Sequence, residues 1–526
     1  MIKYLFIASV FITAKGNLYA QTDNAAKYAA TITKDDLKKH LTVIAGDEFE
    51  GRETGTEGQR KASIYIQDQF KALGLKAPKA LNGYEQFFPL LKDSMTSSLL
   101  SIGGQSLEYG TDYYTSVSFN NIKNIWAKKI IFVGYGISEN NYDDYKGKNV
   151  KGKIVVFLSG EPKKDDQYIV SGNKNPSKYT YPGTLLKLAT AKKKGAAGAI
   201  ILNTNIETIS EQLAQKTRNA AMYYPRPNDV SINYTTLSHA AAKKIFSLWQ
   251  TDSLIAKAKV NKPLNDLKLE LKVPYNFNYN KFRELINASN VLGYIEGTDK
   301  KNEYVFLTAH YDHLGKHDGK IFYGADDDGS GTCAVIEMAD AFAQAAKEGN
   351  RPRRTIVFMT VSGEEKGLWG SEYYSENPVF SLDKTSVDLN TDMIGRIDTE
   401  RKLADTLNYV YVIGHDKLSS DLPIINEGVN KKYTGLTLDY KFDDPNDEER
   451  IYYRSDHYNF ARKGVPILFF YDGMLLSDYH QPTDTIDKIY WDIYEKRARM
   501  IFHTAWEIAN RDEMLKRDKP LPVGER

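Results

Sequence analysis

The chain has 526 residues, which is long enough for more than one domain. Its 70 Lys and Arg nearly balance its 68 Asp and Glu, and no basic stripe is visible, so the composition does not indicate a nucleic-acid-binding protein. The single cysteine, Cys333, excludes an intramolecular disulfide.

The N-terminus has the pattern of a secretory signal. Residues 1–3 form a short positive start, residues 4–14 are an apolar run, and Leu18-Tyr19-Ala20 precedes Gln21. This pattern predicts a signal peptide over residues 1–20, cleaved after Ala20. The run is too short to span a bilayer. No second apolar run is long enough either, so we expect an exported protein, periplasmic or secreted, with no stable membrane span after cleavage.

The segment from residue 33 to about residue 90 reads as helical at first. Ala62, Ile66, Phe70 and Leu73 recur at helical spacing, and Gly74 ends the run. Before this helix, residues 50–58 form a loop punctuated by glycines.

From about residue 115 to 275 the pattern changes to short β runs. Residues 130–136 and 150–157 are two of them, and residues 191–202 read as a helix end, a Gly turn and a buried strand. The pattern predicts an inserted β-rich domain over residues 116–275. An ordinary small β domain of no special type remains the alternative.

The rest of the chain carries His and carboxylate side chains in the numbers that two zinc ions need. Apolar runs over residues 304–308, 355–361 and 467–471 read as buried strands, and the polar segments follow them. Ligands beyond the carboxyl ends of strands are typical of open α/β sheets. The segments are Ala309–His313, Gly324–Gly331, Ser362–Glu365, Leu389–Gly395 and Tyr479–Thr485. They leave one carboxylate over as a base, which indicates a metal-assisted hydrolase.

Two other interpretations of these segments fail on geometry. A calcium loop needs Gly sixth and Glu twelfth, but counting from Gly329 places Val335 twelfth. Ser455-Asp456-His457 contains the residue types of a nucleophilic triad, yet three consecutive residues cannot converge on one another.

From Asn290 to Thr485 the order, spacing and neighbours of these motifs resemble the zinc aminopeptidases of the M28 family, which are co-catalytic di-zinc exopeptidases. The resemblance implies an α/β fold with a mixed, mostly parallel sheet sandwiched by helices, and it identifies the insert as similar to a protease-associated domain. It implies two Zn²⁺ per chain, with Asp327 bridging them. The other ligands that it implies are His310 and Asp392 for one ion, and Glu365 and His480 for the second. It also implies roles for Glu364 as general base, for Asp312 in fixing the His310 tautomer, and for Tyr479 in steadying the oxyanion.

The sequence therefore predicts a peptidase domain made of residues 21–115 and 276–526, interrupted by the insert. We expect an exported enzyme that hydrolyses N-terminal residues from peptides with a free N-terminus. Two alternatives stay open: a glutaminyl-cyclase-like acyltransferase with one zinc, and a receptor-like relative that lacks catalysis. The sequence indicates neither an oligomeric state nor a preferred N-terminal residue.

Overall fold

The computed structural model describes residues 23–118, 120–180, 183–219, 222–226 and 232–521. The predicted signal peptide and its cleavage site lie outside the described residues. The chain divides into two compact units, one made of Met1–Phe88 with Ala288–Arg526 and the other of Pro89–Asn287. Within the described residues, no helix has both the length and the apolar character needed to cross a membrane.

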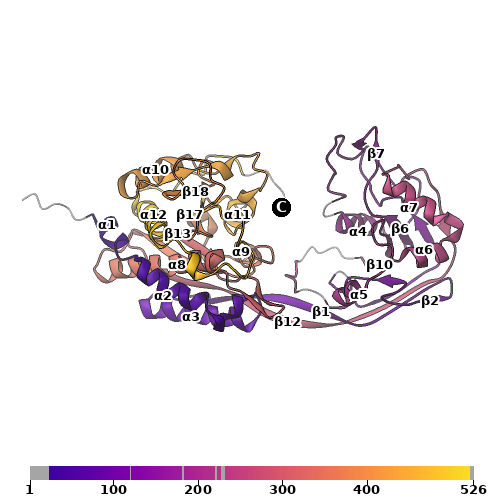
Figure 1. The fold of residues 1–526 in the computed structure, drawn as a ribbon, viewed down its shortest axis with the longest axis horizontal. Helices are drawn as coiled ribbons and strands as arrows, with labels where there is room; N and C mark the ends of the chain where they lie inside the picture. Colours follow the sequence, from indigo (N-terminus) through magenta and orange to yellow (C-terminus); the bar gives the residue numbers. More distant parts are fainter. Residues whose placement is uncertain (1–22, 119, 181–182, 220–221, 227–231, 522–526) are drawn as a thin grey trace, which may run out of the picture. The chain divides into compact units, whose positions relative to one another are not determined.

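The first unit is built on a mixed sheet that contains both parallel and antiparallel strand pairs (Figure 1). The parallel pairs join β13 to β16, β13 to β17, β17 to β20, and β18 to β19. In spatial order the strands are β19 (Thr437–Asp439), β18 (Tyr409–Ile413), β20 (Ile467–Tyr471), β17 (Thr385–Thr391), β13 (Lys300–His310), β16 (Arg354–Val361) and the end of β12 (Tyr275–Ile295). Each of the three apolar runs predicted as strands is a strand here, and the predicted fold class is confirmed.

Helices cover both faces of this sheet, because successive strand residues point to opposite sides. Val305 and Leu307 belong to one hydrophobic core, whereas Phe306 between them belongs to another. The first core is closed by α1 (Asn24–Ala29), α2 (Lys34–Ile44), α3 (Glu57–Leu73), α8 (Gly331–Lys347), α10 (Asp421–Tyr433) and α12 (Trp491–Asn510). The second core takes side chains from α9 (Trp369–Glu376) and α11 (His457–Ala461).

Helix α3 forms where the spacing of apolar residues predicts it. The Thr56 side chain accepts a hydrogen bond from the Gln59 N–H and caps its first turn, and Gly74 ends it with a φ of 82°. Ala62, Ile66 and Phe70 are buried on one face. The Gly-punctuated loop of residues 50–58 therefore leads directly into a helix of the first core.

The second unit has its own six-stranded sheet around a parallel centre. The order is β11 (Glu270–Leu271), β5 (Ile130–Phe132), β6 (Ile154–Leu158), β9 (Gly198–Leu202), β10 (Tyr234–Leu237) and β3 (Tyr113–Tyr114). The predicted helix end, Gly turn and buried strand appear as α4 (Thr184–Lys193), Gly195 and β9. This unit also contains α5 (Glu211–Arg218), α6 (His239–Ile245) and α7 (Thr251–Lys259).

Both boundaries between the units fall inside long strands. The division between Phe88 and Pro89 lies within β1 (Glu85–Ile102), and that between Asn287 and Ala288 lies within β12. The sequence places the limits at 115/116 and 275/276, where the pattern changes. The contacts of the structure instead place them within the continuous strands β1 and β12.

Candidate metal centre

The predicted ligands come from neighbouring strands and from the loops at the same end of the sheet. His310 is the last residue of β13, and Asp392 directly follows β17. Glu364 and Glu365 follow β16, and His480 lies in the loop beyond β20. Because β16, β13, β17 and β20 are consecutive parallel neighbours, their carboxyl ends meet at one edge, where open α/β sheets bind ligands.

Asp327 lies between two groups of side chains, with one carboxylate oxygen toward each. We call the first group site A: His310 Nε2 is 3.2 Å from Asp327 Oδ1 and 3.5 Å from Asp392 Oδ1. In the second group, site B, His480 Nε2 is 3.2 Å from Asp327 Oδ2 and 3.1 Å from Glu365 Oε2. Zinc bonds to His nitrogen and carboxylate oxygen are about 2.0–2.2 Å long, so two ligand atoms at a tetrahedral angle lie about 3.3 Å apart. Both sites match that spacing.

The hydrogen bonding and the charge of these side chains both indicate that the two sites bind cations. Among the described residues, His310 Nε2 is buried and makes no hydrogen bond of suitable geometry, although carboxylate oxygens of Asp327 and Asp392 lie 3.2 and 3.5 Å away. Burial also raises the pKa of Glu364 well above its usual value, against the attraction of His310, and the charges of Glu365 and Asp392 raise it further. Buried carboxylates at this density need compensating positive charge. Two divalent zinc ions would supply it.

Asp327 is held in place by main-chain geometry and by its neighbours. Its N–H and that of Asp326 each donate to Asp484 Oδ2, at 3.1 Å. Gly324 has a φ of 55°, and a Cβ there would lie 2.2 Å from the Asp327 carbonyl oxygen, so this position requires glycine.

The aspartates that flank Asp327 bind main-chain groups. Asp326 Oδ1 accepts from the Gly395 N–H at 2.8 Å. Asp328 Oδ2 accepts from the His310 N–H at 3.2 Å, and its Oδ1 accepts from the N–H groups of Gly331 and Met393. Their side chains therefore tie the loop of Asp327 to the strands that carry His310 and Asp392.

Glu364 lies beside site A without joining its close contacts, since its Oε2 is 4.0 Å from His310 Nε2. It lines a small cavity together with Asp327, Asp392, Arg454 and Tyr479. The remaining wall is mostly apolar: Met393, Ile451, Phe469, Tyr471 and Leu475. A carboxylate in this position faces both the ligand groups and the space where a substrate would enter.

Tyr479 has the surroundings of a neutral hydrogen-bond donor. Its ring stacks on that of His480, with the centroids 3.9 Å apart, and its hydroxyl oxygen accepts from Arg454 Nη2 at 3.1 Å. Burial and the nearby carboxylates raise the pKa of Tyr479, so the phenol keeps its proton at neutral pH. The hydroxyl hydrogen remains available to a ligand in the cavity.

Asp312, the residue predicted to fix the His310 tautomer, contacts His310 through its main chain. His310 Nδ1 lies 3.0 Å from the main-chain oxygen of Asp312, whereas the nearer carboxylate oxygen is 3.8 Å away. The main-chain carbonyl can only accept, so it places the proton on Nδ1 and leaves Nε2 free to bind a cation. The Asp312 carboxylate instead accepts from the Thr54 hydroxyl at 2.6 Å and from the Glu364 N–H at 3.2 Å.

His313 lies in the site, although the family resemblance assigns it no role as a ligand. Its ring is fully buried, and Nδ1 lies 2.7 Å from Glu365 Oε1 and 3.8 Å from Asp327 Oδ2. It therefore contacts the oxygen of Glu365 that does not face His480. The sequence feature that points to His313 as part of the site is its position three residues after His310, within the same ligand segment.

The Ser455-Asp456-His457 set does not form a triad, in agreement with the geometric argument. Ser455 Oγ accepts from Asn390 at 2.8 Å, and Asp456 accepts from Ser371. His457 Nε2 lies 2.9 Å from the Tyr452 carbonyl oxygen. These residues belong to the buried packing behind the site.

Comparisons with known proteins agree with this architecture. Residues 290–505 match the model of peptidase family M28, and residues 127–245 match the PA domain. A probable leucine aminopeptidase of Arthroderma otae is 29% identical over 215 residues, which are 40% of this chain and 55% of that protein. A glutamate carboxypeptidase 2 homolog of Caenorhabditis elegans is 35% identical over 428 residues, 68% of this chain and 50% of that protein. The chain thus spans about half the length of these curated relatives.

A solved structure shares the fold over nearly the whole chain. The aminopeptidase from Aneurinibacillus sp. strain AM-1 superposes with a TM-score of 0.52 at 18% identity, over 93% of this chain and 97% of that one. At this level of identity the likeness concerns the fold alone. The matches to the two family models show that residues 290–505 belong to peptidase family M28 and that residues 127–245 form a PA domain.

Proposed function

We propose that this protein is an exported di-zinc aminopeptidase that removes N-terminal residues from peptides. The observation that carries the proposal is the position of Asp327, which presents one oxygen at 3.2 Å to His310 and the other at 3.2 Å to His480. A carboxylate shared between two His-carboxylate groups is the arrangement that a pair of close metal ions needs. His310, Asp327 and Asp392 would hold one zinc, and Asp327, Glu365 and His480 the second.

The zinc ions, when bound, polarise the scissile carbonyl and make a water molecule more acidic. Glu364 accepts the proton of the attacking water and delivers it to the leaving amine. The cause of its raised pKa, burial among other carboxylates, also favours its action as a base. Glu364 lies close enough to the metal ligands to take a proton from the attacking water. Its Oε2 is 4.0 Å from His310 Nε2, whereas oxygens of the ligands Asp327 and Asp392 are 3.2 and 3.5 Å from that atom.

Tyr479 donates its hydroxyl hydrogen to the substrate oxygen that becomes negative in the transition state. Because Arg454 already donates to the Tyr479 oxygen, the phenol is held in one orientation before substrate arrives. Such preorganised donors stabilise developing charge without rearranging in the reaction. The apolar wall of the cavity then receives the side chain of the N-terminal residue.

A free α-amine is the feature of the substrate that the carboxylates of the cavity select. Asp327, Glu364 and Asp392 all line the cavity and provide negative charge close to a protonated amine. Acetylation removes the charge and adds bulk, and the pairing lost in a water-poor site is strong. We therefore expect aminoacyl anilides and free-amine peptides to be cleaved one residue at a time, with their N-acetyl counterparts nearly inert.

The experiment is a panel of matched peptides with free and acetylated N-termini, followed by mass spectrometry of the products. Release of a C-terminal glutamate from acetylated peptides would instead support a carboxypeptidase. Pyroglutamate formation without peptide cleavage would support a cyclase. Either result, or efficient internal cleavage, would overturn the aminopeptidase assignment.

The export part of the proposal rests on residues 1–20 alone. Mass spectrometry of the protein from its native host should find Gln21 or a near neighbour as the first residue. Intact Met1 on protein in the cytoplasm would contradict export.

A further inference from the structure

Three consecutive residues from the N-terminal part of the chain contact two of the ligand segments and Lys366, the residue that follows a third. They are Arg52, Glu53 and Thr54, in the Gly-punctuated loop before α3, and they lie more than 250 residues before the segments that they contact. We propose that Arg52 and Thr54 are positioning residues of the metal centre, with Arg52 fixing the ligand segments and Thr54 fixing the base. The role assigned to Thr54 rests on the proposed function.

Arg52 joins the His310 segment to the Asp327 segment through main-chain oxygens. Its side chain is fully buried, and Nε donates to the Tyr311 carbonyl at 2.9 Å. Its two terminal nitrogens donate to the carbonyls of Tyr323 at 2.8 Å and Gly324 at 2.9 Å, and one of them also donates to the Ile44 carbonyl at 2.8 Å. One rigid guanidinium therefore sets the distance between the residue after His310 and the turn that carries Asp327.

The charge of Arg52 also opposes the negative charge of the centre. Burial lowers the pKa of Arg52, and the nearby carboxylates of Asp484, Asp312 and Asp327 raise it. A buried guanidinium among main-chain carbonyls is costly unless every donor is used. Packing alone would be served by an apolar side chain, so this arrangement indicates a role in holding the loops.

Thr54 acts on Glu364 through the Asp312 carboxylate. Its hydroxyl donates to Asp312 Oδ2 at 2.6 Å, while Asp312 Oδ1 accepts from the Glu364 N–H at 3.2 Å. Thr54 and Asp312 are both fully buried. A carboxylate with both oxygens engaged cannot rotate freely, so the Thr54 hydroxyl fixes the acceptor that orients the main chain of the base.

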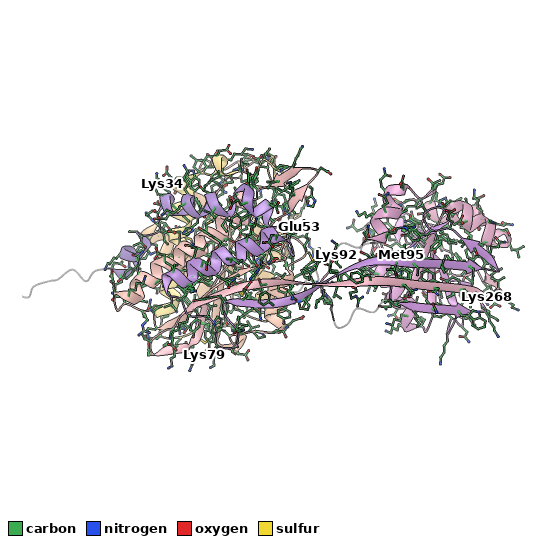
Figure 2. All side chains as sticks on the ribbon, turned by 90° about the horizontal axis from the view of Figure 1, so that it is seen from below. Lys34, Glu53, Lys79, Lys92, Met95 and Lys268 are labelled. Atoms are coloured by element: carbon green, nitrogen blue, oxygen red, sulfur yellow. The ribbon has the colours of Figure 1, made fainter. Side chains whose placement is uncertain are left out.

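Glu53, labelled in Figure 2, is partly exposed and adds a contact with the segment after β16. Its Oε1 lies 2.8 Å from Nζ of Lys366, the residue that directly follows Glu364 and Glu365 in the sequence. The loop also contacts His313, whose N–H donates to the Arg52 carbonyl oxygen at 3.3 Å. A Cβ at Gly51, where φ is 68°, would lie 2.3 Å from the Phe322 carbonyl oxygen.

The test of the Thr54 role uses Thr54→Val, which keeps the shape but removes the donor. We expect kcat to fall roughly 10–100-fold, the usual effect of losing an outer partner of a metal site, with KM and zinc affinity unchanged. Thr54→Ser keeps a hydroxyl and should recover most of the rate.

The matched control is Thr56→Val, two residues along the same loop. The Thr56 hydroxyl donates to the Glu53 carbonyl at 2.6 Å and caps α3, so it supports the loop without contacting Asp312. If Thr54→Val and Thr56→Val had the same kcat at similar melting temperatures, Thr54 would be structural only, and the proposal would be wrong for this residue.

The test of the Arg52 role is Arg52→Lys, which keeps the charge but loses the planar fork. We expect the dissociation constants for zinc, measured by competition with a chelator, to rise roughly 10–100-fold. Unchanged zinc affinity in folded Arg52→Lys would refute this half. If that variant does not fold, Thr54→Val against Thr56→Val decides the proposal. Zinc binding without any peptide cleavage by the unaltered protein would refute the proposed function, and the Arg52 measurement would still stand by itself.

Discussion

Glu364→Gln is expected to keep zinc and fold but to lose about 10²–10⁴-fold in kcat, the range for removal of a general base. Gln has nearly the same shape as Glu and cannot accept the proton of the attacking water. The Glu364 side chain is more distant from its neighbours than the ligands are from one another, at 4.0 Å from His310 Nε2. Metal analysis and kinetics on the same preparation measure both properties.

The adjacent residue is the matched control for this variant. Glu365 Oε2 lies 3.1 Å from His480 Nε2, so Glu365→Gln should weaken the zinc of site B and lose activity that excess zinc partly restores. If Glu364→Gln instead lost zinc while its turnover survived, the two glutamates would have to exchange roles.

Asp327→Asn is expected to lose nearly all activity and most of the bound zinc. The amide has one oxygen and no negative charge, whereas the carboxylate presents an oxygen to each of two sites. Both ions should therefore bind more weakly, and chelators should remove them more readily. Zinc content after gel filtration and kcat/KM with added zinc check this result.

Asp326→Asn is the control for Asp327→Asn, since it changes the neighbouring residue in the same way. Asp326 Oδ1 accepts from the Gly395 N–H, and the oxygen of Asn can do the same. This variant should keep two zinc ions and most of its activity. Equal losses in both variants, with the fold intact, would count against Asp327 as the shared ligand.

The strands that carry the ligand segments can be predicted from the sequence, because each strand is recognised from its own short run of residues. The runs at 304–308, 355–361 and 467–471 consist mostly of apolar residues, which is typical of strands buried on both faces, and all three are strands of the first sheet. The polar residues that follow strands in parallel register then meet at one edge. The choice of Asp327 over Asp326 and Asp328 came from the family resemblance, and the contacts of the three side chains are consistent with it.

The sequence does not predict which side chains from distant segments contact one another. Arg52 and Thr54 look like loop residues, because nothing in residues 50–58 shows that they meet residues 311–324 and 364. The acceptor for His310 Nδ1 is a main-chain carbonyl, which residue identities cannot indicate. The limits of the two units lie inside β1 and β12, so no change from strand to loop marks them along the chain.

Crystals of the zinc-loaded protein, measured on both sides of the zinc absorption edge, test the central claim most directly. We predict two anomalous peaks per chain, about 3.5–4 Å apart, one on either side of the Asp327 carboxylate. One peak should lie beside His310 and Asp392, and the other beside Glu365 and His480. A single peak at full zinc occupancy, or two peaks that do not share Asp327, would contradict the account.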